Sequence, residues 1–224
     1  MPLKIAILAS GSGTNAQAMF DKINAGLLDA RVVLVLSNRP QATVLERARA
    51  FGAPVCALDH KAYPDRESFD RAMLAEVQHS GADLVVLAGY MRMLTSAFLH
   101  PLTGRVINLH PALLPSFPGV HGGADAQDWG VKITGCTVHF VDEKMDNGAV
   151  IAQAAVPALP DEPLDDLMQR IHSFEHRLYP QVIQWFAEGR VQADGRQVHI
   201  LPAHKEQVLP DGHWMVWPPL EAGF

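Results

Sequence analysis

Asn108 and His110 lie two residues apart at the end of a short apolar segment, Val106 to Pro111. Because side chains alternate along a strand, the amide and the imidazole are expected on the same side of it. Pro111 cannot extend a sheet and favours an extended conformation at His110, so the strand is predicted to end there. Ligands bind at the carboxyl ends of strands in open α/β sheets. The two residues are therefore candidate catalytic groups, the alternative being a strand end with two solvated polar side chains.

An amide, an imidazole and a carboxylate suit acyl transfer to an amine. The amide donates a hydrogen bond to a carbonyl oxygen that becomes negative, and the histidine stabilises that oxygen or moves a proton. A carboxylate such as Asp146, in the polar loop 142–148, would orient the imidazole and favour its charged form. No serine or cysteine is placed beside His110 as a nucleophile, so direct transfer is expected rather than a covalent intermediate.

A second candidate site follows the first predicted strand. The segment Ser10 to Asn15 contains two glycines and precedes a predicted helix, whose free N–H groups would favour an anion such as phosphate. The spacing of Gly11, Gly13 and Ala16 also fits the dinucleotide fingerprint, and Arg39 after the second strand leaves an NADP site as an alternative. A plain strand-to-helix turn is the bland alternative.

The elements that position these residues predict an α/β fold. Apolar runs alternate with amphipathic segments in the first half of the chain, which predicts a doubly wound, mostly parallel sheet with a Rossmann-like N-terminal half. Thr134 to Val141 and Ala149 to Val156 predict an antiparallel edge. The loop from Pro111 to Gly123 has three prolines and three glycines and is expected to lack regular structure. Further predictions are strands Leu3–Ala9, Ala30–Leu36, Val55–Leu58 and Asp83–Gly89, helices Ala42–Phe51 and Pro163–Gly189, helices capped by Asp65 and Thr95, and a hairpin Arg190–Leu201.

The long helix raises a metal alternative. His172-Ser173-Phe174-Glu175-His176 matches an inverted zinc-protease pattern with both histidines on one face. No acidic helix follows to supply a third ligand, because the chain soon becomes proline-rich, so no metal is expected.

Composition limits the protein class. The 224 residues suit one domain, 1–201, with a tail, 202–224, in which Trp214 and Trp217 look exposed. A net charge of −6 makes a broad nucleic-acid surface unexpected. Cys56 and Cys136 are far apart and suggest no disulfide or zinc framework. Without a signal peptide or an apolar run of spanning length, the protein is expected to be cytoplasmic and not bound to membranes.

Four motifs together are more specific than any one of them. They are Ser10 to Asn15, Ala88-Gly89-Tyr90-Met91-Arg92, Asn108-Leu109-His110-Pro111 with Leu113-Leu114-Pro115, and His139-Phe140-Val141 leading to Asp146. With these motifs the sequence resembles the phosphoribosylglycinamide formyltransferase family of purine biosynthesis, from Leu3 to about Gly189.

The resemblance implies that 10-formyltetrahydrofolate, as co-substrate, gives its formyl group to the glycinamide amine of 5-phosphoribosylglycinamide, by direct attack through a tetrahedral intermediate. It implies a catalytic triad in which Asn108 holds the formyl oxygen, His110 donates a proton and Asp146 favours the charged histidine. The remaining implied contacts are Gly13, Thr14 and Asn15 with the phosphate, His172, Ser173, Phe174 and Glu175 with the glycinamide substrate, and Arg66, Met91, Arg92, Met93, Leu94, Asn108, Asp142, Glu143, Lys144, Met145 and Asp146 with the folate.

Two departures from the family pattern put loop geometry in doubt: Asn147 stands where a glycine is usual, and Gly122-Gly123 interrupts the loop after His121. Two relatives carry further domains, an N-terminal one in formyltetrahydrofolate hydrolase and a C-terminal RNA-binding one in the initiator-tRNA formyltransferase. The predicted first strand already begins at Leu3, which argues against the hydrolase. The phosphate loop favours a small phosphorylated acceptor, which argues against the tRNA enzyme. An NADP oxidoreductase and a regulatory folate-binding protein are alternatives of other classes. The protein is expected to be a monomer or a homodimer.

Overall fold

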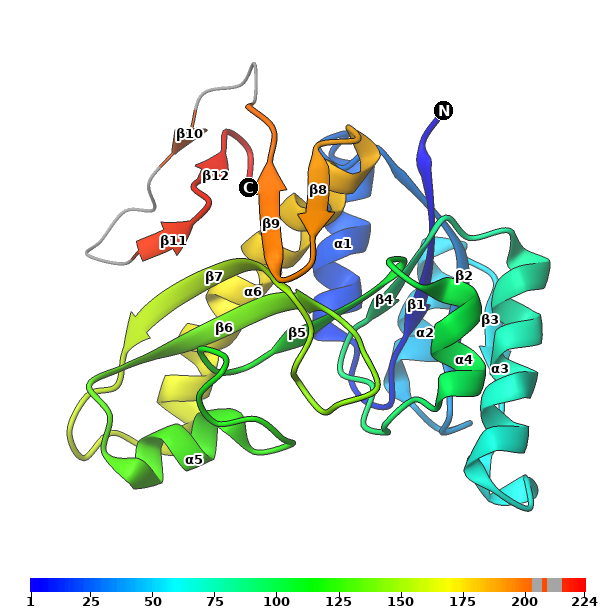
Figure 1. The fold of residues 1–224 in the computed structure, drawn as a ribbon, viewed down its shortest axis with the longest axis horizontal. Helices are drawn as coiled ribbons and strands as arrows, with labels where there is room; N and C mark the ends of the chain where they lie inside the picture. The colour runs from blue at the N-terminus through cyan, green and yellow to red at the C-terminus, as the bar shows by residue number, and fades with distance from the viewer. Residues whose placement is uncertain (203–206, 209–214) are drawn as a thin grey trace. The chain divides into compact units, whose positions relative to one another are not determined.

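The protein was analysed as a computed structural model, which describes residues 1–202, 207–208 and 215–224 (Figure 1). The chain forms two compact units. Unit 1 comprises residues 1–108 and 141–143, and unit 2 comprises residues 109–140 and 144–224. The strand β5 (Val106–His110) carries the chain from the first unit into the second, with Asn108 as the last residue of unit 1.

Unit 1 is built on parallel strands. Their order is β5, β4, β1, β2 and β3, so β1 lies in the middle and β3 at one edge. In β5, Asn108 is paired with Leu87 of the neighbouring strand. The bounds of the other four strands are β1 Leu3–Leu8, β2 Ala30–Ser37, β3 Val55–Ala57 and β4 Leu84–Leu87.

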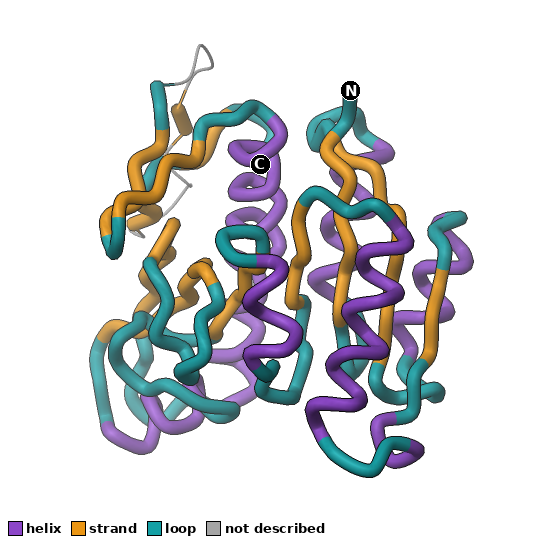
Figure 2. The backbone as a smooth tube through the Cα atoms, turned by 45° about the vertical axis from the view of Figure 1, so that its right-hand side comes forward, coloured by secondary structure: helices purple, strands orange, loops and turns teal. Residues whose placement is uncertain are grey.

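Helices cover both faces of the strands of unit 1, as Figures 1 and 2 show. Alternate residues of β1 divide between the faces: Ala6 and Leu8 belong to a buried cluster with side chains of α3 and α4, whereas Ile5 and Ile7, equally buried, do not. The predicted strand-and-helix alternation and the doubly wound arrangement are confirmed in this unit. The helices are α1 Thr14–Asn24, α2 Thr43–Phe51, α3 Arg66–Ser80 and α4 Ser96–Leu99, with short 3₁₀ turns at His60–Ala62 and His100–Leu102.

Unit 2 is built on an antiparallel hairpin and one long helix. The strand β6 (Ile133–Phe140) pairs with β7 (Val150–Pro157), which confirms the predicted antiparallel strands. The helix α6 (Leu164–Ala187) packs against both strands, and α5 (Gly122–Trp129) packs against α6. The predicted terminal hairpin is confirmed as β8 Val191–Asp194 and β9 Gln197–Ile200, and three short strands follow, β10 Gln207–Val208, β11 Met215–Trp217 and β12 Leu220–Glu221.

Two helix starts differ from prediction in detail. Pro163 is the residue before α6 and lies outside the first turn. Thr95 stands at the predicted cap position of α4, but its side chain makes no capping hydrogen bond with the described residues. Its backbone N–H instead donates to the buried carboxylate of Asp70 at 2.6 Å, and α4 is only four residues long.

The expectation that the loop from Pro111 to Gly123 lacks regular structure is wrong at its end, because α5 begins at Gly122. Both glycines are buried, and neither has a positive φ, so their backbones are compatible with a helix. A Cβ on Gly123 would overlap the Sδ atom of Met168 in α6. Gly123 therefore allows a close approach of the two helices, and packing overrides its low helix propensity.

The described part of the tail packs against unit 2. Strand β11 pairs with β7, and the carboxylate of Glu221, 1% exposed, accepts hydrogen bonds from Arg190 at 2.5 Å and from the Trp185 indole at 3.4 Å. The residue Trp214 and the side chain of Trp217 lie outside the described residues, and the boundary at 201 stays a prediction.

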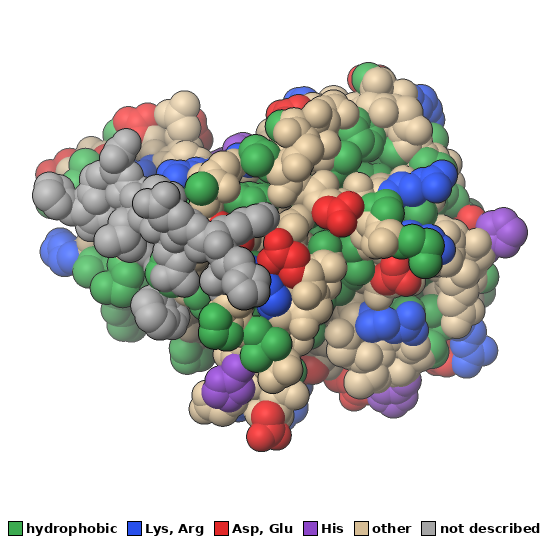
Figure 3. Space-filling model, turned by 90° about the horizontal axis from the view of Figure 1, so that it is seen from above, with side chains coloured by type: hydrophobic (Ala, Val, Ile, Leu, Met, Phe, Trp, Pro, Cys, Tyr) green, Lys and Arg blue, Asp and Glu red, His purple; other side chains and the backbone are tan. Residues whose placement is uncertain are grey.

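The cysteines, the helices and the surface charge bear on the class of protein. Cys136 is buried and Cys56 is half-buried, and both thiols are free. Among the described residues, no helix is both long and apolar enough to cross a membrane. On the face drawn in Figure 3, acidic and basic side chains are interspersed, in keeping with the modest net charge of −6.

The carboxylate of Glu162 joins the end of β7 to α6. It accepts hydrogen bonds from Arg170 at 2.7 and 3.1 Å and from the backbone N–H of Leu159 at 2.7 Å, and the Glu162 carbonyl accepts one from Gln127 of α5. The Arg170 hydrogen bonds are the main cause that holds the pKa of Glu162 below its usual range.

We predict that Glu162→Gln destabilises the protein by about 1 kcal/mol at pH 7. A carboxyl group with a lowered folded pKa stabilises above its unfolded value, about 4.3, and this contribution is lost as the pH falls through the folded pKa. The stability difference between variant and wild type should therefore shrink towards pH 3. Urea unfolding at both pH values measures it, with Glu67→Gln, from the exposed pair with Arg71, as the control. An undiminished difference at pH 3 would contradict the ion pair.

Candidate active site

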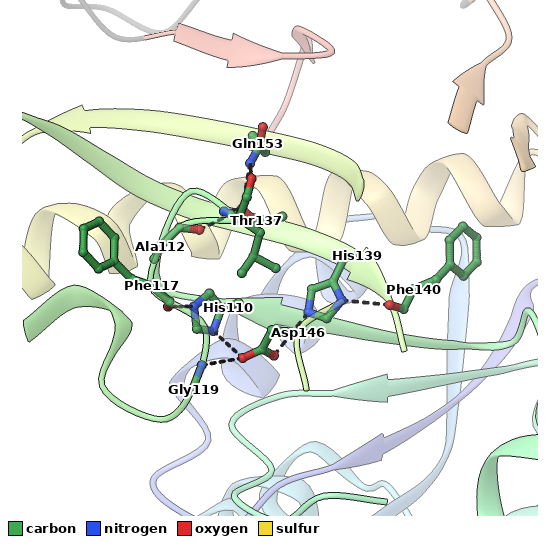
Figure 4. A network of polar contacts seen from close by, with 10 residues as sticks. His110, Ala112, Phe117, Gly119, Thr137, His139, Phe140, Asp146 and Gln153 are labelled. Atoms are coloured by element: carbon green, nitrogen blue, oxygen red, sulfur yellow. Dashed lines mark hydrogen bonds and ion pairs between the residues drawn. The ribbon is translucent and has the colours of Figure 1, made fainter. Parts of the chain in front are cut away.

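His110, the last residue of β5, is only 3% exposed, and both of its ring nitrogens face oxygen atoms (Figure 4). Nε2 lies 2.7 Å from the carbonyl oxygen of Phe117. Because a carbonyl can only accept, Nε2 carries a hydrogen and donates it. Nδ1 lies 3.5 Å from Oδ2 of Asp146, which is an ion-pair distance and longer than a good hydrogen bond.

Asp146 lies between two imidazoles (Figure 4). Besides His110, its carboxylate faces Nε2 of His139 at 3.7 Å and accepts a hydrogen bond from the backbone N–H of Gly119 at 2.7 Å. His139, 2% exposed on β6, has its Nδ1 2.7 Å from the carbonyl oxygen of Phe140 and donates to it. The backbone of Asp146 has φ 47°, a left-handed conformation that aspartate tolerates better than most residues.

The arrangement of protons follows from this geometry. In each imidazole one nitrogen donates to a carbonyl, and the other faces the carboxylate of Asp146. Two histidines therefore share one carboxylate, and each ring is oriented by a carbonyl on one side and by that carboxylate on the other.

The beginning of the loop after His110 is fixed by side chains of the hairpin. The hydroxyl of Thr137 on β6 donates to the carbonyl of Ala112 at 2.7 Å and accepts from the N–H of Leu114 at 3.0 Å. The amide of Gln153 on β7 donates to the Leu114 carbonyl and to the Thr137 hydroxyl. This polar network, drawn in Figure 4, sets the path of the loop towards Phe117.

The predicted phosphate loop forms the N-terminus of α1 in unit 1. Gly13 is the residue before the helix, and the described residues supply neither a side-chain cap nor an acidic residue in the first turn. Thr14 and Asn15 open the helix, with the Thr14 side chain exposed. Such a helix end suits an anion. Gly13 has a packing role as well, since it has φ 75° and a Cβ there would lie 2.6 Å from Val44 of α2.

Several predicted folate contacts gather in unit 1. The guanidinium of Arg66 donates to the carbonyl of Met93 at 2.8 Å. The side chains of Met93 and Met91 are 42% and 55% exposed, so two flexible apolar groups lie near a cation. The N–H of Met91 donates to the hydroxyl of Ser10, which links this segment to the start of the glycine loop.

The other predicted folate residues of unit 1 differ in environment. Leu94 is buried in the core, and the guanidinium of Arg92 lies over the ring of Phe69, 5.4 Å from its centroid. Asp142 is exposed. Exposed Glu143 lies 2.8 Å from His100, and a hydrogen bond from Ser96, followed by that from His100, lowers its pKa.

The remaining predicted residues belong to unit 2. Lys144 and Met145 are exposed in the loop before Asp146. In the middle of α6, Phe174 and Glu175 are buried, whereas Ser173 is exposed and its hydroxyl donates to the carbonyl of Arg170. His172 lies 4.0 Å from Glu175 and stacks on the ring of His176. Among the described residues, no group of three or more potential ligands could hold a metal ion.

The structure thus brings His110 and Asp146 together, as predicted, and places half-buried Asn108 two residues before His110 on the same strand. The binding roles of the other residues stay predictions. His139 is a site residue that the sequence reasoning does not include. The signal for it is a histidine near the end of the predicted strand Thr134 to Val141, three residues before the polar loop 142–148.

Asn147, one of the two departures from the family pattern, makes a side-chain hydrogen bond in the structure. Asn147, next to Asp146, accepts a hydrogen bond at 2.9 Å from the guanidinium of Arg196, in the turn of the β8–β9 hairpin. The loop that carries Asp146 is therefore held from the hairpin side, through a side chain that a glycine would lack.

Residues 3–183 match the family model described as formyl transferase, and the chain belongs to that family. It is 41% identical over 190 residues to the phosphoribosylglycinamide formyltransferase of Escherichia coli (strain K12), a match that covers 85% of this chain and 90% of that protein. The crystal structure of glycinamide ribonucleotide transformylase 1 from Symbiobacterium toebii is 47% identical, with a TM-score of 0.88, and the match covers 90% of this chain and 95% of that one. The family resemblance and the fold class inferred from the sequence are confirmed.

A third relative is much longer than this chain. The trifunctional purine biosynthetic protein adenosine-3 of Drosophila melanogaster is 44% identical over 188 residues, which are 83% of this chain and 14% of that protein. The chain therefore spans about a seventh of that relative's length.

We predict that Asp146→Asn affects both histidines. Without the carboxylate charge, the rings of His110 and His139 should each lose their ion-pair partner, so the ring ¹⁵N and ¹H signals of both should shift at pH 7. NMR measures these shifts, with exposed His199 as the internal control. If the signals of both buried rings stay as in the wild type, the carboxylate has no electrostatic role and only holds the loop through Gly119.

Proposed function

We propose that this chain transfers the formyl group of 10-formyltetrahydrofolate to the amine of 5-phosphoribosylglycinamide. The observation that carries the proposal is the similarity to the phosphoribosylglycinamide formyltransferase of Escherichia coli, with 41% sequence identity in a match that covers 90% of that protein. The polar residues of β5 support it, because an amide and a buried imidazole beside a carboxylate suit acyl transfer.

The acceptor's phosphate would bind at the N-terminus of α1. The N–H groups of Gly13, Thr14 and Asn15 lie in a helix start whose first turn carries no acidic residue. A phosphate there is favoured both by hydrogen bonds and by the helix dipole. His172 to Glu175 are proposed to contact the glycinamide part.

The residues around Arg66 fit a folate. Exposed Met91 and Met93 present polarizable surface to a flat ring, and the Arg66 guanidinium nearby suits a carboxylate. Leu94, Arg92 and the backbone from Asp142 to Asp146 are proposed to complete these contacts. The bound folate supplies the formyl carbon.

The residues of β5 and Asp146 would carry the reaction. As the acceptor amine forms its C–N bond, the amide of Asn108 would donate to the formyl oxygen, which becomes negative. A protonated His110 would exchange its hydrogen bond to Phe117 for one to the substrate and give that proton to the leaving folate nitrogen as the old C–N bond breaks. The proton that the attacking amine loses on becoming an amide would return to the ring, directly or through water, so the step balances. Asp146 would keep that ring charged and oriented, and His139 would hold Asp146 in place.

The setting proposed for this activity is the cytoplasm, with the protein as a monomer or homodimer that acts on small molecules. The absence of a spanning helix among the described residues and the net charge of −6 are in keeping with it.

The decisive assay follows release of tetrahydrofolate from 10-formyltetrahydrofolate, with and without glycinamide ribonucleotide. Release that depends on the ribonucleotide, with formation of its formyl derivative, supports the proposal. Equal release without it would indicate a hydrolase, and binding without turnover would indicate a regulatory folate-binding protein.

We predict that Asn108→Ala lowers kcat about 100- to 1,000-fold, the usual loss for one such donor. Asn108→Asp should be at least as damaging, because it places a negative charge against the developing oxyanion. Steady-state kinetics measure both, alongside urea unfolding to show that the variants fold. Near wild-type turnover in folded Asn108→Ala would remove this role.

We predict that Thr14→Asp raises KM for the ribonucleotide about tenfold or more, and leaves KM for the folate unchanged. An acidic residue in the first turn stabilises a helix, so folding should not suffer. Its charge would repel the phosphate by about 1 kcal/mol or more at close range, and about 1.4 kcal/mol corresponds to tenfold. Thr14→Asn, of the same size and neutral, is the control. If both variants behave alike, no phosphate binds there.

A further inference from the structure

Gly122, the first residue of α5, lies against the ring of His110. An ideal Cβ built on Gly122 would be 2.8 Å from Nε2 and 3.0 Å from Cε1 of that ring, and 3.0 Å from the carbonyl oxygen of Phe117. Ordinary van der Waals contact begins at 3.4 Å. The missing side chain therefore makes room for both partners of the hydrogen bond between His110 and Phe117.

The reason for this glycine is not the backbone. Gly122 has no positive φ and lies in a helix, where alanine is favoured over glycine by about 1 kcal/mol. The same holds for Gly123 beside it, but a Cβ on Gly123 would lie 2.4 Å from Sδ of Met168, near the end of a flexible side chain that can turn away, and 3.6 Å from the Ile171 methyl group. The two glycines share one helical turn, and only Gly122 touches the imidazole.

We propose that Gly122 is a positioning residue for His110. By lacking a side chain, it lets the ring settle against the first turn of α5, with Nε2 donating to Phe117 and Nδ1 turned towards Asp146. The ring orientation that the proposed formyl transfer needs thus depends on a residue that touches no reacting atom. The inference about the ring position stands on the structure, and only the expected effect on turnover rests on the proposed function.

Two further features show that the position of the His110 ring is fixed by the surrounding loop. Phe117 has φ 53°, an unfavourable conformation for a bulky residue, and its carbonyl is the one that accepts from His110. The loop before it is fixed by the Thr137 and Gln153 hydrogen bonds. The shortest contact of a Cβ at position 122 would be to the ring, so a shift of the ring is the expected response to a side chain there.

The experiment compares Gly122→Ala with Gly123→Ala. Both substitutions raise helix propensity equally, but only the first places a methyl group against the imidazole. To regain ordinary contact the ring must retreat by roughly 0.5–1 Å, and a misplacement of about 1 Å can cost 100-fold in rate. We expect kcat for formyl transfer to fall about ten- to a hundredfold in Gly122→Ala, with KM for both substrates within about twofold, and Gly123→Ala to stay near wild type.

The second readout is the ring itself. In the wild type, NMR should show contacts between Hε1 of His110 and the Hα atoms of Gly122, and the ¹⁵N shift of Nε2 should indicate a hydrogen-bonded N–H. Gly122→Ala should change the Nε2 shift and Gly123→Ala should not. The wild-type contact needs no variant, so it tests the proposal even if Gly122→Ala does not fold.

Three outcomes would overturn the proposal: equal loss of kcat in both variants, an unchanged Nε2 shift in Gly122→Ala, or absence of the wild-type contact. Failure of the proposed function is a different result, in which the wild type forms no formylated ribonucleotide while the ring contacts and their response to the substitutions are as expected.

Discussion

The unit 2 site depends on one carboxylate that serves two buried imidazoles. Asp146 is itself largely buried, and a buried carboxylate is costly unless it is paired. The rings of His110 and His139 lie at ion-pair distance from it, and the N–H of Gly119 supplies a hydrogen bond. Since each ring also gives a hydrogen to a backbone carbonyl, the rings cannot turn without breaking a bond. Two loops that lack regular structure, 111–121 and 144–149, are thereby fixed to the ends of β5 and β6.

The same physical solution recurs where other irregular segments of unit 2 meet its core. Glu162 and Arg170 attach the turn before α6, and Glu221 and Arg190 attach the last described residues of the chain. In each pair the carboxylate is nearly buried and takes a hydrogen bond from a further donor, the N–H of Leu159 for Glu162 and the Trp185 indole for Glu221. Loops that bury little apolar surface are thus held by charge-assisted hydrogen bonds.

Strand alternation and the proline after His110 were enough to predict the polar pair on β5, the parallel strands and the antiparallel hairpin. Periodicity does not predict where a loop folds back against the ends of the strands. The left-handed backbones of Phe117 and Asp146 bring a carbonyl and a carboxylate to the same ring. A phenylalanine does not signal such a conformation, and an aspartate tolerates it without requiring it. His139 was missed for the same reason, because its role depends on the returning loop. From the sequence, the two glycines of α5 indicate a loop rather than a helix. Only the packing in the folded chain, such as that of Gly123 against Met168 of α6, explains why they start a helix.

These misses concentrate where local preference and function disagree. A phenylalanine with positive φ, two buried imidazoles and a helix that starts with two glycines each lower stability on local grounds. They persist because the surrounding hairpin over-determines the loop through Thr137 and Gln153. In the proposed transfer, His110 would keep Nδ1 towards Asp146 and turn its Nε2 hydrogen from the Phe117 carbonyl to the substrate. Nδ1 faces a carboxylate that is also held by His139 and Gly119, whereas Nε2 is held by a single carbonyl, so the second contact is the easier one to exchange.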